Sequence, residues 1–100
     1  MKPFLLEVSE KAEQEFIEAY LFYYQIRPQL ADSFDKEVKA VFNYIAENSH
    51  LFPEKHKSFH EAVVKVFPFI VVYQIMQSKI IVHAIFHTSR NQKIKIKIKK

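Results

Sequence analysis

The sequence VVKVFPFIVVYQIMQSKIIVHAIFHTSR, residues 63–90, decides the fold. It holds two strand-length runs of apolar, β-branched and aromatic residues, residues 71–75 and 80–86, which are joined by a polar segment at residues 77–79. A short polar joint between two such runs predicts a β-hairpin. Both alternating positions along each run are largely apolar, so we expect both faces of the hairpin to be covered, one by helices and the other by something else, such as a partner.

The residues before the hairpin predict one more strand. Residues 59–67 alternate between apolar and charged side chains, which is typical of a half-buried strand. Pro68, inside the FPF sequence, predicts a bend before the next strand begins. Residues 51–57 contain a proline and several charged side chains, which indicates a loop.

The N-terminal half has a short strand pattern followed by helical periodicity. Residues 4–8 are a short apolar run, and Ser9 can cap a helix with its side-chain oxygen. Apolar residues then recur at intervals of three and four up to Arg27, where Pro28 ends one helix and suits the first turn of another. The predicted fold class is α+β: an N-terminal strand, a helical hairpin, then a three-stranded antiparallel meander, forming one small sheet.

The composition excludes several classes of protein. A chain of 100 residues with 49% hydrophobic residues can build one core and one domain. The absence of Cys excludes disulfides, cysteine zinc sites and thiol nucleophiles, and the absence of Gly excludes glycine-rich phosphate-binding loops. No apolar run approaches the roughly 20 residues of a membrane span, and no signal peptide is evident. We expect a cytoplasmic protein with no cofactor and no membrane partner.

The charge is divided unequally between the two halves of the chain. Residues 1–54 contain 5 basic and 10 acidic residues, whereas residues 55–100 contain 10 basic and 1 acidic residue. This division predicts that the C-terminal half binds an anionic partner, either nucleic acid or an acidic protein segment. The last eight residues, KIKIKIKK, can be a lysine-protected sheet edge, a strand that pairs with a partner or a basic arm on nucleic acid.

The histidines do not predict a metal site. His83 and His87 are expected on one face of a strand, but four residues along a strand span about 13 Å, which is too far for one zinc ion. His56 and His60, in HKSFH, lack an evident third ligand.

One pair of residues has side chains suited to acid–base catalysis and phosphate binding. In HTSR, His87 can act as an acid or base while Arg90 clamps a phosphate. Alternatively, His87 ends a half-exposed strand and Arg90 binds a carboxylate from a partner or a helix. We favour a binding role for Arg90, which leaves both as weak catalytic candidates. The tyrosines at 20, 23 and 24 are interpreted as core residues.

The order of several motifs resembles the RelE/ParE toxins of bacterial type II toxin-antitoxin systems. The motifs are Ala12 with residues 16–24, then RPQLADSF, KVFPFIVVY and IIVHAIFHTSRN. FPF-x-V-V-Y and H-x-x-R are the most specific of them. The resemblance predicts a single toxin domain at residues 1–91 and leaves residues 92–100 as a basic tail.

The resemblance implies one of two activities. RelE-like members are ribosome-dependent mRNA endonucleases that use basic side chains on the open face of the sheet. ParE-like members are associated with inhibition of DNA gyrase and have no established catalytic set. The positions of those basic residues correspond here to Glu61, Val63 and Ile70, and a carboxylate there would oppose phosphate binding. The ParE-like branch is therefore favoured.

The predicted function is that of a plasmid-stabilisation toxin that binds and inhibits gyrase. An acidic, partly disordered antitoxin is expected to neutralise it in a hetero-oligomer. One alternative is a RelE-like endoribonuclease acting on ribosome-bound mRNA, in which His87 is the acid or base and Arg90, with Lys55 and Lys57, clamps phosphate. Another is a degenerate member that binds its antitoxin without toxicity. The residues predicted to contact the target or antitoxin are His60, Lys65, His83, His87, Arg90, Lys93 and Lys95.

Overall fold

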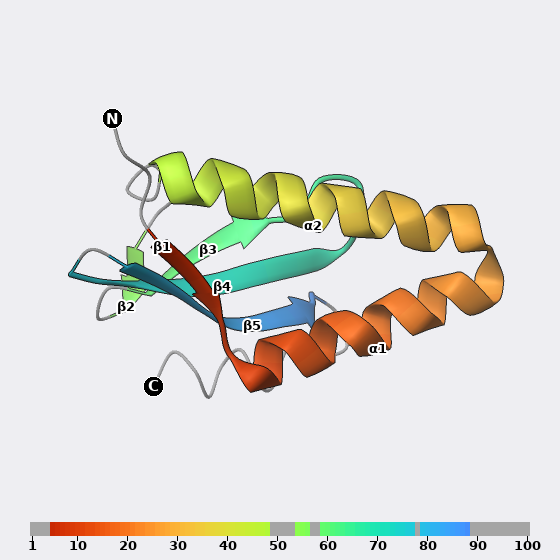
Figure 1. Ribbon diagram of the computed structural model, residues 1–100, viewed down its shortest axis with the longest axis horizontal. Helices are drawn as coiled ribbons and strands as arrows, with labels where there is room; N and C mark the ends of the chain where they lie inside the picture. The colour runs from red at the N-terminus through yellow and green to blue at the C-terminus, as the bar shows by residue number, and fades with distance from the viewer. Residues whose placement is uncertain (1–4, 49–53, 57–58, 78, 89–100) are drawn as a thin grey trace.

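The protein folds as a helical hairpin packed on one five-stranded sheet (Figure 1). The computed structural model describes residues 5–48, 54–56, 59–77 and 79–88. Along the chain the elements are β1 (Leu5–Val8), α1 (Glu10–Ile26), α2 (Pro28–Asn48), β2 (Glu54–His56), β3 (Phe59–Val63), β4 (Phe69–Met76) and β5 (Lys79–His87). The strand order across the sheet is β1-β5-β4-β3-β2. The predicted α+β class is confirmed.

The helix boundaries lie where local chemistry predicts them. Ser9 is the N-cap of α1, and its side-chain oxygen accepts a hydrogen bond from the Ala12 amide at 3.1 Å. Arg27 leaves the helix in an extended conformation, with φ −169° and ψ 127°, because the following proline disfavours helical geometry there. Pro28 then begins α2 directly.

The sheet is mixed, with both antiparallel and parallel pairs of strands. β3, β4 and β5 form the predicted antiparallel meander. β1, however, runs parallel to β5, with Leu6 opposite Ile80. A parallel pair needs a long crossover connection, and here the whole helical hairpin and meander separate the two strands. No local pattern in the sequence specifies that pairing.

A short strand also replaces part of the predicted loop at residues 51–57. β2, Glu54–His56, pairs antiparallel with β3, and the register shifts between its two ends. It forms one edge of the sheet, and β1 forms the other. Proline and charge at this segment are compatible with an edge strand, where only one side must pair.

The main core lies between the helices and one face of the sheet. Its centre is an aromatic cluster in which Phe34 of α2 lies 5.3 Å from Phe67 and 5.1 Å from Phe69, measured between ring centroids. Tyr23 of α1 completes it, 5.1 Å from Phe67. Of the three tyrosines predicted as core, only Tyr23 is buried. Tyr20 is half-buried and its hydroxyl donates to Asp32 at 3.3 Å, and Tyr24 is 50% exposed.

The opposite face of the sheet, which we call the second face, carries a separate apolar cluster. Ile70 and Val72 of β4 and Ala84 and Phe86 of β5 form it, and each is 7% exposed or less. Its buried residues come from the sheet, whereas those of the main core include residues from both helices. Burial on both faces explains why β4 is almost continuously apolar. No helix in the described part of the chain is long and apolar enough to cross a membrane.

Candidate partner-binding surface at the β5 bulge

A β-bulge in β5 determines which side chains reach the second face. Val72 pairs with Ala84 and the next residue, Tyr73, pairs with Val82, so His83 is an extra residue in β5. On the far side of the bulge His87 pairs with Phe69, which belongs to the main core. The extra residue resets the alternation of side chains along the strand. The prediction that His83 and His87 share a face is therefore wrong.

His83 is held on the second face by two side chains. Its Nε2 atom lies 3.0 Å from Oε1 of Gln74, and its ring centroid lies 5.1 Å from that of Phe59. Because a side-chain carbonyl oxygen accepts, the contact is a hydrogen bond in the tautomer that carries the proton on Nε2. Burial lowers the pKa of His83 from its ordinary value of 6.5, and the positive charge of Lys11 lowers it further. The imidazole is therefore neutral at pH 7 and acts as a hydrogen-bonding group, not as a cation.

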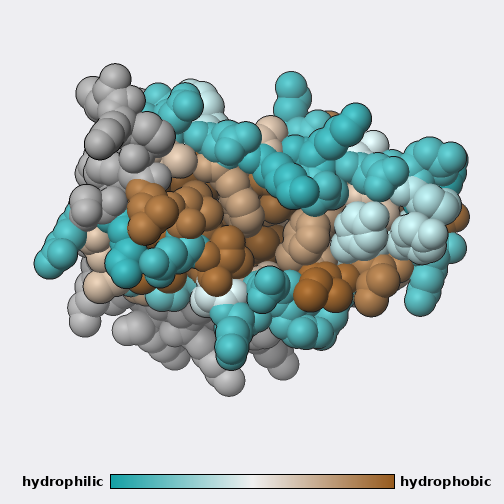
Figure 2. Space-filling model, in the orientation of Figure 1, coloured by the Kyte–Doolittle hydropathy of each residue, from teal (hydrophilic) through white to brown (hydrophobic). Residues whose placement is uncertain are grey.

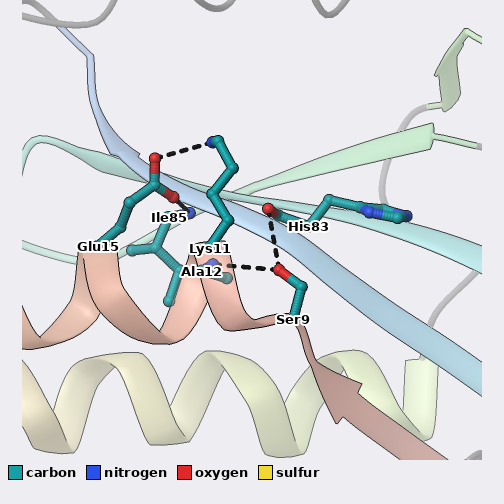
Figure 3. Close-up of polar contacts among 6 residues, drawn as sticks. All are labelled: Ser9, Lys11, Ala12, Glu15, His83 and Ile85. Carbon is teal, nitrogen blue, oxygen red and sulfur yellow. Dashed lines mark hydrogen bonds and ion pairs between the residues drawn. The ribbon is translucent and has the colours of Figure 1, made fainter.

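The first two turns of α1 bind the backbone of the bulge (Figure 3). The Ser9 amide donates to the Val82 carbonyl at 3.0 Å, and the Ser9 hydroxyl donates to the His83 carbonyl at 3.3 Å. The Ile85 amide donates to Oε1 of Glu15 at 2.8 Å. The other carboxylate oxygen, Oε2, lies 2.9 Å from the Lys11 ammonium. The helix start and the bulge therefore form one hydrogen-bonded unit.

Among the described side chains, the second face carries little positive charge. Val63 lies directly opposite Ile70, and Glu61 lies two residues away, so the three positions that the family resemblance singles out lie together. Val63 is 69% exposed and Ile70 is 7% exposed. Lys79 is at the hairpin end of this face and pairs with Glu7 of β1 at 3.5 Å. A scissile phosphate would meet a carboxylate and apolar side chains here.

The other predicted contact residues are spread over different environments. His60 is 5% exposed and stacks on Tyr73, with ring centroids 5.1 Å apart and an interplanar angle of 13°. It therefore packs beneath the surface. Lys65 is exposed in the turn after β3, beside Val66, which has a left-handed φ of 76° and is 83% exposed. This conformation is unusual for a β-branched residue.

The remaining candidates lie at the end of β5 or outside the described residues. His87 ends β5, half-buried, with its ring centroid 5.2 Å from Phe69. Arg90, Lys93 and Lys95 lie outside the described residues, as does Lys57. The structure thus joins His83 to Phe59 and Gln74, and it separates His83 from His87. Among the described side chains, no three His, Asp or Glu residues converge on a metal site.

A groove between the helices was not predicted from the sequence. It has a volume of about 190 Å³, and apolar side chains are visible between the two helices in Figure 2. Glu13, Asp35 and Lys39 stand among its lining residues, and Lys39 pairs with Asp35 at 3.2 Å. Helical periodicity predicted the apolar face of each helix, but the groove depends on how the two helices pack against each other and against the sheet. The apolar lining residues are Val8, Phe16, Val38, Phe42 and Ile85.

Comparison with known proteins identifies the family. The model of the ParE toxin of the type II toxin-antitoxin system parDE matches residues 6–92. This chain belongs to the ParE toxin family. A solved structure described as the chromosomal ParDE toxin-antitoxin system from P. aeruginosa has the same fold as this ParE family member, with a TM-score of 0.74 at 14% identity. The match covers 84% of this chain and 95% of that one. No curated protein matches this chain in sequence.

Proposed function

We propose that this ParE family member is the toxin of a toxin-antitoxin pair and that it stops growth by binding and inhibiting DNA gyrase. It acts in the cytoplasm, without a cofactor and without a catalytic step, and a cognate acidic antitoxin neutralises it. The observation that carries this proposal is the composition of the second face at Glu61, Val63 and Ile70. Family membership supports the toxin role and leaves the target to be tested.

The second face favours protein binding over RNA cleavage. Cleavage of a phosphodiester needs positively charged or hydrogen-bonding groups aimed at the developing negative charge. Glu61 opposes that charge, and Val63 and Ile70 cannot stabilise it. His83 is neutral, and His87 lies on the helix side of the strand, away from these positions. An exposed Val63 at one end of β3, and a partly buried ring with a hydrogen-bonded histidine at the other, are instead suited to contact with a protein surface.

The antitoxin is proposed to bind the basic half of the chain. Residues 55–100 carry 10 basic residues and 1 acidic residue, which attracts an acidic and partly disordered segment. The similar structure from P. aeruginosa is described as a ParDE system, which supports a hetero-oligomer with an antitoxin. We propose contacts at Lys65, His83 and His87, with Arg90, Lys93 and Lys95 from the segment that follows, and with His60 packing beneath them.

The decisive experiment is expression of the protein alone from a tightly controlled promoter. Growth, plasmid supercoiling and mRNA integrity are followed together, and supercoiling by purified gyrase is measured with the purified protein. Growth arrest with altered plasmid topology, inhibited gyrase and intact mRNA is expected. Arrest with rapid mRNA cleavage would favour the RelE-like alternative. Absence of arrest in a folded protein would indicate a degenerate antitoxin-binding member.

The antitoxin contact is tested by charge reversal. Lys65→Glu is expected to weaken antitoxin binding, and the loss should shrink as salt is raised, because the contact is exposed and screened. Lys36→Glu on α2 is the matched control, since Lys36 is also exposed but lies outside the basic half. Equal weakening by both variants would show that only net charge matters.

A further inference from the structure

The backbone of β5 loses a strand neighbour at the point where its bulge begins. β1 pairs with β5 only as far as Val8 opposite Val82, after which the chain turns into α1. Beyond Val82 the edge of β5 that faced β1 has no further β1 residue to pair with, and the bulge disturbs the ladder to β4 as well. Backbone donors and acceptors left unpaired in such a place destabilise the local structure.

α1 supplies the missing partners from two positions. Ser9 bonds to the carbonyls of Val82 and His83, as described above. Glu15, two turns into the helix, accepts from the Ile85 amide at 2.8 Å. Its side chain is 20% exposed, so the bond is partly shielded from water. Lys11 pairs with the second carboxylate oxygen at 2.9 Å, which limits the directions in which the carboxylate can point.

The bulge also determines which side chains surround His83. His83 follows Val82, a main-core residue, and so lies on the second face, where Gln74 and Phe59 hold its ring. The extra residue then puts Ala84 and Phe86 on that same face. If β5 relaxed to a regular ladder, the side chains on one side of the bulge would change faces. The groups that fix the bulge therefore keep Ala84 and Phe86 on the second face with the imidazole, although they do not touch it.

We propose that Glu15 is a positioning residue for the partner-contact surface: its bond to the Ile85 amide holds the bulge in β5 and so keeps Ala84 and Phe86 on the second face, where they complete the surroundings of the His83 ring. The importance of that surface rests on the proposed function, but the coupling between Glu15, the bulge and His83 does not. Any partner that contacts His83 depends on the first turns of α1, on the other side of the strand.

The test compares three variants of one helix. Glu15→Ala removes the acceptor, whereas Glu15→Gln keeps an oxygen in the same place and is expected to restore the bulge. Glu18→Ala is the matched control, because Glu18 is an exposed glutamate of the same helix and accepts a hydrogen bond from Gln14 at 3.5 Å. If Glu15→Ala does not fold, Glu15→Asp replaces it, because its carboxylate is one methylene shorter and falls short of the amide.

Amide hydrogen exchange and imidazole titration by NMR are measured on the free protein. In Glu15→Ala the Ile85 amide should exchange about tenfold faster or more, while amides in the middle of α2 stay protected. The His83 pKa should move up toward 6.5 as the ring loses its buried position. Glu15→Gln and Glu18→Ala should resemble the wild type in both measurements. Unchanged Ile85 exchange and His83 titration in Glu15→Ala, or equal changes in Glu18→Ala, would overturn the proposal.

A binding measurement separates this proposal from the function on which it rests. Affinity for purified gyrase should fall about tenfold in Glu15→Ala and return in Glu15→Gln, if His83 is a contact. If the wild type does not bind gyrase but Glu15→Ala still speeds exchange of the Ile85 amide and raises the His83 pKa, the proposed target is wrong and the positioning role stands. If gyrase binds and Glu15→Ala changes neither NMR measurement, the positioning role is wrong and the target stands.

Discussion

Substitution of Tyr73 gives a demanding test of the packing in this sheet. Tyr73 is the largest of the fully buried side chains in the described chain, with an exposure of 0%. It lies in the middle of β4, and its ring stacks on His60 of β3 at 5.1 Å. Tyr73→Ala leaves a cavity that the neighbouring strands cannot fill, so the free energy of unfolding should fall by about 3–5 kcal/mol. A domain of this size has only about 5–15 kcal/mol in total.

The same residue should make the protein sensitive to alkaline pH. Burial raises the pKa of Tyr73 from 10.0 to about 12. As the pH rises, the unfolded chain loses the Tyr73 hydroxyl proton before the folded chain does. The contribution of this shift to the free energy of unfolding is therefore complete below pH 10 and is lost as the pH rises toward 12. One pKa unit corresponds to about 1.4 kcal/mol, so the full loss is roughly 2–3 kcal/mol. Tyr73→Phe keeps the ring and removes the ionisation.

Urea unfolding at pH 8, 10 and 11 measures this effect. Between pH 8 and pH 11 the free energy of unfolding of Tyr73→Phe should rise by about 1 kcal/mol relative to that of the wild type, because pH 11 lies halfway between the two pKa values of Tyr73. Tyr44→Phe is the control, since Tyr44 is 51% exposed on α2. If wild type and Tyr73→Phe lose stability in parallel over this range, the ring does not titrate as a buried group and the reasoning fails.

Three further predictions concern the helix start, the bulge and Arg90. Ser9→Ala removes the cap of α1 and its bond to the His83 carbonyl, so thermal unfolding should indicate a loss of about 1 kcal/mol. Burial lowers the pKa of His83, so the free energy of unfolding of the wild type should fall as the pH drops below 6.5. In chemical denaturation, the free energy of unfolding that His83→Gln loses relative to the wild type should therefore be smaller at pH 5 than at pH 7.5. Arg90→Ala should weaken growth arrest while circular dichroism and the melting temperature stay unchanged, and full toxicity of that folded variant would exclude Arg90 from the contact.

Local chemistry in the sequence was sufficient for the helices and the hairpins. The Ser9 cap, the Arg27-Pro28 junction and the polar joint near Gln77 all act within a few residues of where they occur, so each could be recognised without the fold. Gln77 in fact has the left-handed φ of 56° that a tight hairpin turn uses. His83 was also among the contact residues predicted from the sequence, and that role stays a prediction.

Only the tertiary structure decided where these candidates point. An extra residue in β5 leaves His83 on the second face and moves His87 to the helix side, and no pattern in residues 80–87 marks that insertion. Packing buries His60 against Tyr73, and parallel pairing places β1 beside β5. Strand periodicity specifies two faces but not the register that assigns side chains to them, because register depends on partners far away in the chain. The sequence by itself determined the apolar faces and the elements other than β2. The site depends on non-local hydrogen bonds, above all those from Ser9 and Glu15 to the bulge.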